Sequence, residues 1–194
     1  GLQTLDEFLK GGLQTVDQFL DTNQESTKEA TAPASSCGHG RPEVFLYMYD
    51  ITNGFARRWT RFKGIWHTGV VVCWPSNFPS AGTQYWLGDK IHVSWAETTA
   101  YQKPVEKRFL GYTSRSCAAT LDFVRRQQAK PFSYDLLWNN CNHFSDMLCV
   151  FLLDKHIPNE VLNQPQHVMR SYPLLTKLLT LLRARLRRSA CEVS

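Results

Sequence analysis

Short apolar runs and longer periodic stretches divide the middle of the chain into two kinds of predicted element. Four runs rich in β-branched and aromatic residues, each bounded by turn-forming residues, predict strands over residues 44–49, 67–73, 85–87 and 91–93. Two later stretches predict helices. The first is capped by Thr113 or Ser114 and runs to about residue 127, and the second covers residues 141–153. Because the strands cluster before the helices, the sequence predicts an α+β fold instead of alternating βαβ units.

A repeat marks the N-terminus, where the sequence LQTLDEFL, beginning at Leu2, returns as LQTVDQFL, beginning at Leu13. Its apolar positions are spaced by three and four residues, as on one side of a helix, although Gly11 and Gly12 interrupt the pattern. Two short helices or one frayed helix fit equally well. The segment is either a docking helix for a partner or dimer mate, or an appendage that folds back onto the domain. Residues 22–41, which are rich in small and polar residues, predict a flexible linker.

The C-terminal stretch interleaves leucines with basic residues. Leucines recur through residues 174–186 with Lys177, Arg183 and Arg185 among them, and two further arginines follow. A basic amphipathic helix of this kind fits membrane contact, a nuclear address, an export signal, or a helix packed on the domain or on its dimer mate. The predicted organisation is therefore an N-terminal extension (1–41), a globular domain (42–168) and a basic leucine-rich tail (169–194).

Composition and charge limit the class of protein. The chain has 194 residues, 43% of them hydrophobic, and six tryptophans, which is enough for one globular domain with a real core. No run of about 18 apolar residues occurs, so no membrane span is expected. The net charge of +5 comes largely from the tail, whereas residues 1–36 carry six acids against two lysines. We therefore expect no nucleic-acid-binding surface on the domain itself.

The six cysteines, at positions 37, 73, 117, 141, 149 and 191, lack the regular spacing of a secreted disulfide scaffold. Together with the absence of a signal-peptide pattern, this predicts reduced thiols and a cytoplasmic or nuclear location. Cys37 and Cys141 each precede a histidine by two positions, but one intervening residue is not the spacing of a structural zinc site. We therefore expect no metal and no cofactor.

Two short motifs carry the candidate chemistry. In GIWHTG, residues 64–69, His67 opens the apolar run of a predicted strand. In NNCNHFS, residues 139–145, Cys141 lies where an Asn-rich turn gives way to a predicted helix. A helix N-terminus favours the thiolate form of a cysteine through the backbone dipole and the exposed N–H groups. A thiol nucleophile and a histidine base are the minimum for acyl transfer by cysteine.

Other histidines and tryptophans have weaker claims on the site. His143 is a rival base, but residues two apart on a helix point in different directions, so we expect it on the rim or in the groove. His39 and His92 are expected to be ordinary surface or loop histidines. Trp66 and Trp86 are candidates for the walls of the cleft.

The two motifs and their surroundings closely resemble the PPPDE peptidases, also called deSUMOylating isopeptidases. The matching segments are residues 44–51, 54–58, 64–68, 109–113, 134–145, 157–158 and 161–162. The resemblance implies a circularly permuted papain-like fold with a small antiparallel sheet packed with helices. It also implies that His67 is the general base and Cys141 the nucleophile, in a chain order that is the reverse of papain's.

By the same resemblance, the substrate is SUMO or another ubiquitin-like modifier joined to a lysine of a target protein. Two alternatives stay open: a thioesterase for S-acylated proteins, and a non-catalytic module that binds a modifier. The loop between residues 73 and 85 and the connection over 97–107 are expected to shape the substrate groove, so the choice of substrate is the least transferable inference.

Acyl transfer also needs hydrogen-bond donors for the negative charge that develops on the carbonyl oxygen. The simplest donor is the backbone N–H of Cys141, and a side-chain amide from Asn139, Asn140 or Asn142 could add to it. The sequence does not choose among these three, and it names no residue that orients His67.

Overall fold

The computed structural model describes residues 40–52, 54, 58, 64–75, 82–97, 103–131, 134–135 and 137–171. The N-terminal repeat, the pair Cys37 and His39, and the leucine-rich basic stretch after Ser171 lie outside the described residues. No helix in the described part of the chain is long and apolar enough to cross a membrane.

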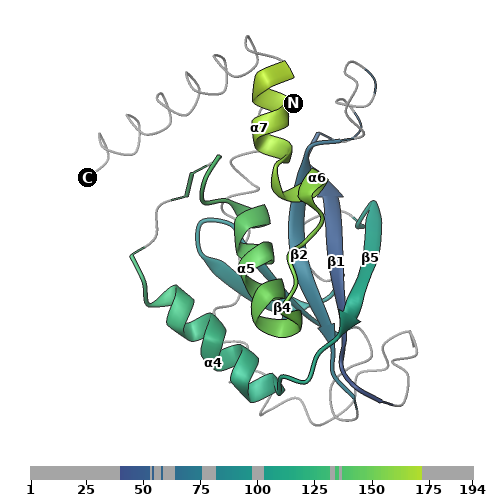
Figure 1. Ribbon diagram of the computed structural model, residues 1–194, viewed down its shortest axis with the longest axis vertical. Helices are drawn as coiled ribbons and strands as arrows, with labels where there is room; N and C mark the ends of the chain where they lie inside the picture. The colour runs from purple at the N-terminus through teal and green to yellow at the C-terminus, as the bar shows by residue number, and fades with distance from the viewer. Residues whose placement is uncertain are drawn as a thin grey trace.

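Five strands form one antiparallel sheet in the order β4-β3-β2-β1-β5 (Figure 1). Their bounds are Glu43–Asp50 (β1), Trp66–Cys73 (β2), Thr83–Leu87 (β3), Ile91–Trp95 (β4) and Glu106–Tyr112 (β5). The first four contain the four predicted strands. With the helices described next, they confirm the predicted α+β class.

The helices follow all five strands, with bounds of Cys117–Gln128 (α4), Cys141–Leu153 (α5), Asn159–Leu162 (α6) and Gln164–Ser171 (α7). The predicted start of α4 is wrong by two to three residues. Its N-cap is Ser116, whose hydroxyl accepts a hydrogen bond from the N–H of Ala119 at 3.1 Å. The Thr113 hydroxyl instead donates to the carbonyl of Leu152 at 2.6 Å, which ties the chain before α4 to the end of α5.

Strand β5 is the element that sequence patterning missed. The connection expected over residues 97–107 runs into this strand, which lies at the edge of the sheet beside β1. As an edge strand it buries little of either face: Phe109 and Tyr112 are exposed, and no buried alternation marks it. A register shift between Val44 and Phe45 further interrupts its pairing with β1.

The sheet buries two different faces. On the helix face, α5 packs across β2 and β3, and α4 joins the same core. This core is built from Val44, Leu46, Met48, Val70, Val72, Tyr85, Leu121, Val124, Phe144, Leu148 and Leu152. The opposite face, here called the aromatic face, carries Tyr47, Tyr49, His67, Val71, Gln84, Trp86 and His92. Strand alternation therefore sends neighbouring residues of β2 into different environments.

Candidate active site

The start of α5 is fixed by its capping residue. Asn140 is the N-cap, and its side-chain oxygen accepts hydrogen bonds from the backbone N–H groups of Asn142 (2.9 Å) and His143 (3.3 Å). The same oxygen lies 2.9 Å from Nδ1 of His143. Cys141 is thereby held as the first residue of the helix, as the sequence predicted.

The Cys141 side chain is 6% exposed, and its sulfur is surrounded by hydrogen-bonding groups. The backbone N–H of Thr68 and the hydroxyl of Tyr134 both hydrogen-bond to the sulfur, and the thiol faces the side-chain oxygen of Asn142 at 3.5 Å. Burial is the largest influence and raises the pKa of Cys141, although these hydrogen bonds act in the opposite direction. The backbone N–H groups at the helix start favour the thiolate, as expected, but burial acts more strongly and the pKa of Cys141 is raised overall.

His67 lies in β2 opposite Tyr49 of β1 and is 3% exposed. Its ring meets the ring of Trp86 edge-on, with the centroids 5.5 Å apart and the planes at 84°, and the ring of Tyr49 lies 6.2 Å away. Burial, followed by the nearby charge of His92, lowers the pKa of His67 to about 3. At rest, His67 therefore carries a neutral imidazole and Cys141 a neutral thiol.

Thr68 connects the two motifs. Its backbone N–H reaches the Cys141 sulfur, and its hydroxyl lies 3.0 Å from the side-chain oxygen of Asn142 and 2.9 Å from the hydroxyl of Ser145. The residue next to His67 is thus anchored to the first two turns of α5. The fold brings together the histidine strand and the cysteine helix, which are more than 70 positions apart in the sequence.

The three candidate asparagines are placed differently. Asn142 uses both ends of its amide within the fold, because its oxygen faces Thr68 and its nitrogen donates to the carbonyl of Val161 at 2.9 Å. Asn140 caps α5 as described above. Asn139 is exposed and its backbone pairs with Asp135. A role for any of them toward an oxyanion stays a prediction.

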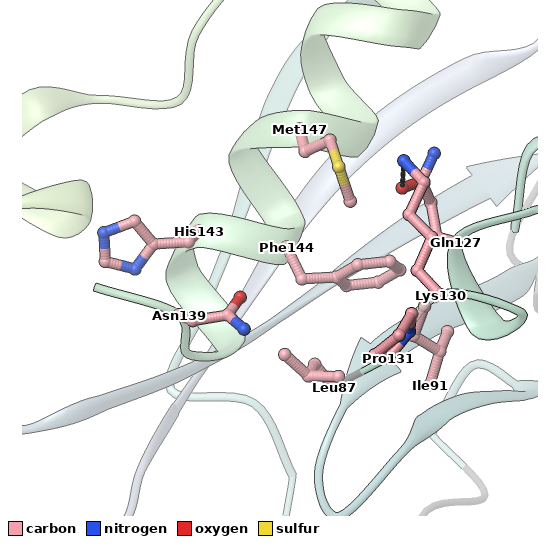
Figure 2. Close-up of a pocket in the computed structure, with 9 residues that line it drawn as sticks. All are labelled: Leu87, Ile91, Gln127, Lys130, Pro131, Asn139, His143, Phe144 and Met147. Carbon is pink, nitrogen blue, oxygen red and sulfur yellow. Dashed lines mark hydrogen bonds between the residues drawn. The ribbon is translucent and has the colours of Figure 1, made fainter. Parts of the chain in front are cut away.

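Beside the first turns of α5 lies a pocket of about 260 Å³ (Figure 2). Its lining residues are Leu87, Ile91, Gln127, Lys130, Pro131, Asn139, His143, Phe144 and Met147. Figure 2 shows Asn139 and His143 at one end of this set, away from Gln127 and Lys130. His143 lines this pocket, and Cys141 is not among the lining residues. The place of His143 on the rim or in the substrate groove stays a prediction.

The expectation for His92 is wrong. It lies in β4, is 3% exposed, and stacks on Trp86 with the ring centroids 4.3 Å apart, while its Nε2 lies 2.8 Å from a carboxylate oxygen of Asp89. The register of the β3–β4 pair sets Trp86 opposite His92 and so places both rings on the aromatic face. Three isolated residues between turn signals were too few to reveal which face His92 occupies.

Sequence reasoning also gave no role to Thr68, Tyr134 or Gln164. Thr68 and Tyr134 lie within the segments that resemble the family, but nothing in their spacing indicated contact with the thiol. Gln164 accepts from the N–H of Trp66 and donates to the carbonyl of Gly64, both at 2.8 Å. A contact across about 100 positions leaves no local sequence signal.

Comparison with known proteins agrees with this architecture. The family model described as "PPPDE putative peptidase domain" matches residues 42–179. The chain is 31% identical over 142 residues to "Desumoylating isopeptidase 1" of Homo sapiens, covering 65% of this chain and 76% of that protein. It is 30% identical over 141 residues to the protein of that name from Xenopus laevis, covering 68% of this chain and 78% of the relative.

A thiol at the start of a helix that packs on an antiparallel sheet defines a cysteine-type hydrolase of papain-like fold. The chain belongs to the PPPDE peptidase family.

Proposed function

We propose that this protein is a thiol isopeptidase that releases SUMO from lysine side chains of conjugated proteins, with Cys141 as nucleophile and His67 as general base. The observation that carries the proposal is the hydrogen bond from the Thr68 N–H to the Cys141 sulfur, since it sets the thiol beside the residue that follows His67. The names of the two relatives support the choice of modifier.

The reaction starts from a neutral pair. His67 takes the thiol proton as the sulfur attacks the carbonyl carbon of the isopeptide bond, and the new imidazolium then protonates the leaving lysine amine. This leaves a thioester between the modifier and Cys141. Water, deprotonated by His67, attacks the thioester and releases the carboxylate and the thiol. The Thr68 and Tyr134 hydrogen bonds stabilise the sulfur while it carries negative charge.

The Cys141 backbone N–H is the best-placed donor for the oxyanion. The N–H groups of Asn142 and His143 donate to the side chain of the N-cap Asn140. The N–H of Cys141 instead faces the sulfur of the same residue. A carbonyl under attack by this sulfur therefore develops its charge close to an N–H group at the positive end of α5.

SUMO and ubiquitin carrying a C-terminal electrophile test this proposal, with adducts followed by intact mass. We expect a SUMO adduct on the wild type, none on Cys141→Ala, and formation slowed about 100-fold or more by His67→Ala. Cys117→Ala, which removes a half-buried cysteine at the start of α4, is the matched control and should react like the wild type. An adduct with ubiquitin alone would overturn the modifier, and an adduct that survives Cys141→Ala would overturn the nucleophile.

The pocket beside α5 favours a second candidate, hydrolysis of an S-acyl thioester. Leu87, Ile91, Phe144 and Met147 give this pocket an apolar lining next to the first turn of α5, which suits a short acyl chain. The same Cys141 and His67 would carry it out. Turnover of an S-acylated peptide that is lost in Cys141→Ala and weakened by Phe144→Asp would support this candidate, and no turnover would eliminate it.

A further inference from the structure

The three residues before His67 have an unusual backbone arrangement. On the side of β1, the N–H of Ile65 meets the Asp50 carboxylate at 3.3 Å and its carbonyl accepts from the N–H of Ile51 at 3.0 Å. On the other side, where a neighbouring strand would normally pair, the buried side chain of Gln164 hydrogen-bonds to the residues before and after Ile65. The Gln164 oxygen accepts from Trp66 N–H, and its nitrogen donates to the carbonyl of Gly64.

Gln164 thus acts as a substitute for a peptide group of a neighbouring strand. Alternate residues of a strand point their N–H and C=O groups to the same side. Along the side of β2 that faces away from β1, the Trp66 N–H meets Gln164, the Thr68 N–H meets the Cys141 sulfur, and Val70 pairs with Tyr85 of β3. Pairing between β2 and β3 begins only at Gly69. At Trp66 and Thr68, the Gln164 amide and the Cys141 thiol stand where β3 would otherwise pair with β2.

The same short unit touches both halves of the site. Helix α6 supplies the Val161 carbonyl that accepts from Asn142, next to the nucleophile, and α7 begins at Gln164. His67 lies between the two anchored residues, Trp66 and Thr68. Without the Gln164 amide, the segment before His67 is bonded only on the side of β1. The buried Gly64 carbonyl and the partly buried Trp66 N–H then lose their hydrogen bonds.

We propose that Gln164 is a positioning residue that holds the start of β2, and with it His67, in register with the Cys141 thiol. This inference rests on the proposed function, because it concerns the pairing of these two groups. A displacement of about 1 Å at a reacting group costs on the order of 100-fold in rate, so a clamp one residue before His67 matters to turnover.

The variants Gln164→Leu, Gln164→Glu and His67→Ala test the inference, with Gln128→Leu as matched control. Gln128 also donates its side-chain nitrogen to a backbone carbonyl, that of Ile91 at 2.8 Å. Four quantities are measured on each full-length variant: the urea midpoint of unfolding, kcat and KM for a SUMO conjugate, and the rate of iodoacetamide alkylation of Cys141 from pH 5 to 9.

We expect Gln164→Leu to lower kcat by about 10- to 100-fold with KM within about twofold. It should slow Cys141 alkylation, and combining it with His67→Ala should add no further loss, because both changes remove the same contribution of His67. The kcat and the alkylation rate of Gln164→Glu should approach those of the wild type as the pH falls, since a protonated carboxyl again donates a hydrogen bond to the Gly64 carbonyl. This recovery is the readout if Gln164→Leu does not fold.

The outcomes separate the two ideas. If His67→Ala is impaired while Gln164→Leu matches Gln128→Leu, the inference is overturned and the proposed function stands. Additive losses in the double variant, or a Gln164→Glu profile parallel to wild type, would also overturn it. If His67→Ala reacts like the wild type, the proposed function fails and the inference fails with it.

Discussion

Both faces of the sheet are buried, but different side chains fill them. The helix face is an apolar core in which β1, β2 and β3 pack against α5 through aliphatic and aromatic carbon. The aromatic face buries rings and polar groups, such as the Tyr49 hydroxyl that donates to Gln84 at 3.0 Å and the His67, Trp86 and His92 rings. Apolar packing is non-directional and fixes the position of side chains by their volume. The rings and hydrogen bonds of the aromatic face also fix the orientation of each ring. The two candidate groups belong to different faces: Cys141 packs in the helix-face core, and His67 lies among the rings of the aromatic face.

Leu148→Ala should produce the largest loss of stability on the helix face. Leu148 is fully buried in the core, so truncation leaves a cavity and should lower the free energy of unfolding by about 2–5 kcal/mol. Urea denaturation measures this. Val150→Ala, at an exposed position of the same helix, should cost less than about 1 kcal/mol. Similar losses for the two variants would contradict the assignment of the core.

Gly69→Ala should disturb the aromatic face instead. A Cβ at Gly69 would lie 2.6 Å from the Gln84 side-chain nitrogen and 3.3 Å from Cβ of Trp86. Gln84 is buried and bonded to Tyr49, so it cannot move freely, and we expect a loss of about 1–3 kcal/mol in the free energy of unfolding. Gly40→Ala, where nothing lies within 4 Å, is the control for the same chemical change. A Gly69→Ala variant as stable as Gly40→Ala would show that the aromatic face accommodates the added Cβ without loss of stability.

The buried imidazole makes stability depend on pH. Because burial lowers the pKa of His67 from 6.5 to about 3, the unfolded chain binds a proton here at a higher pH than the folded protein does. Between these two values the free energy of unfolding should therefore fall as the pH falls, by up to about 1.4 kcal/mol per pH unit. His67→Gln should flatten this slope in urea titrations at successive pH values. His156→Gln, at an exposed histidine, is the control, and equal slopes for wild type and His67→Gln would refute the effect.

The fold and the site differ in how far sequence could predict them. Residues 141–153 were predicted as a helix and form α5, because an Asn cap and a periodic apolar stretch are local signals. Strand β5 (Glu106–Tyr112) was missed because it lies at the edge of the sheet and carries no buried alternation. His92 was misplaced because the face on which it lies depends on its pairing with Trp86, a property of register.

The sequence by itself determined which residues could react and which elements would carry them, since the His67 and Cys141 motifs and the apolar periodicity are local. Only the tertiary structure decided that Thr68 would hydrogen-bond to the thiol, that Gln164 would bond the strand before His67, and that His67 and Cys141 would both rest neutral. The physical reason is that desolvation and hydrogen bonding depend on everything packed around a group. Most of those neighbours lie tens of positions away in the chain.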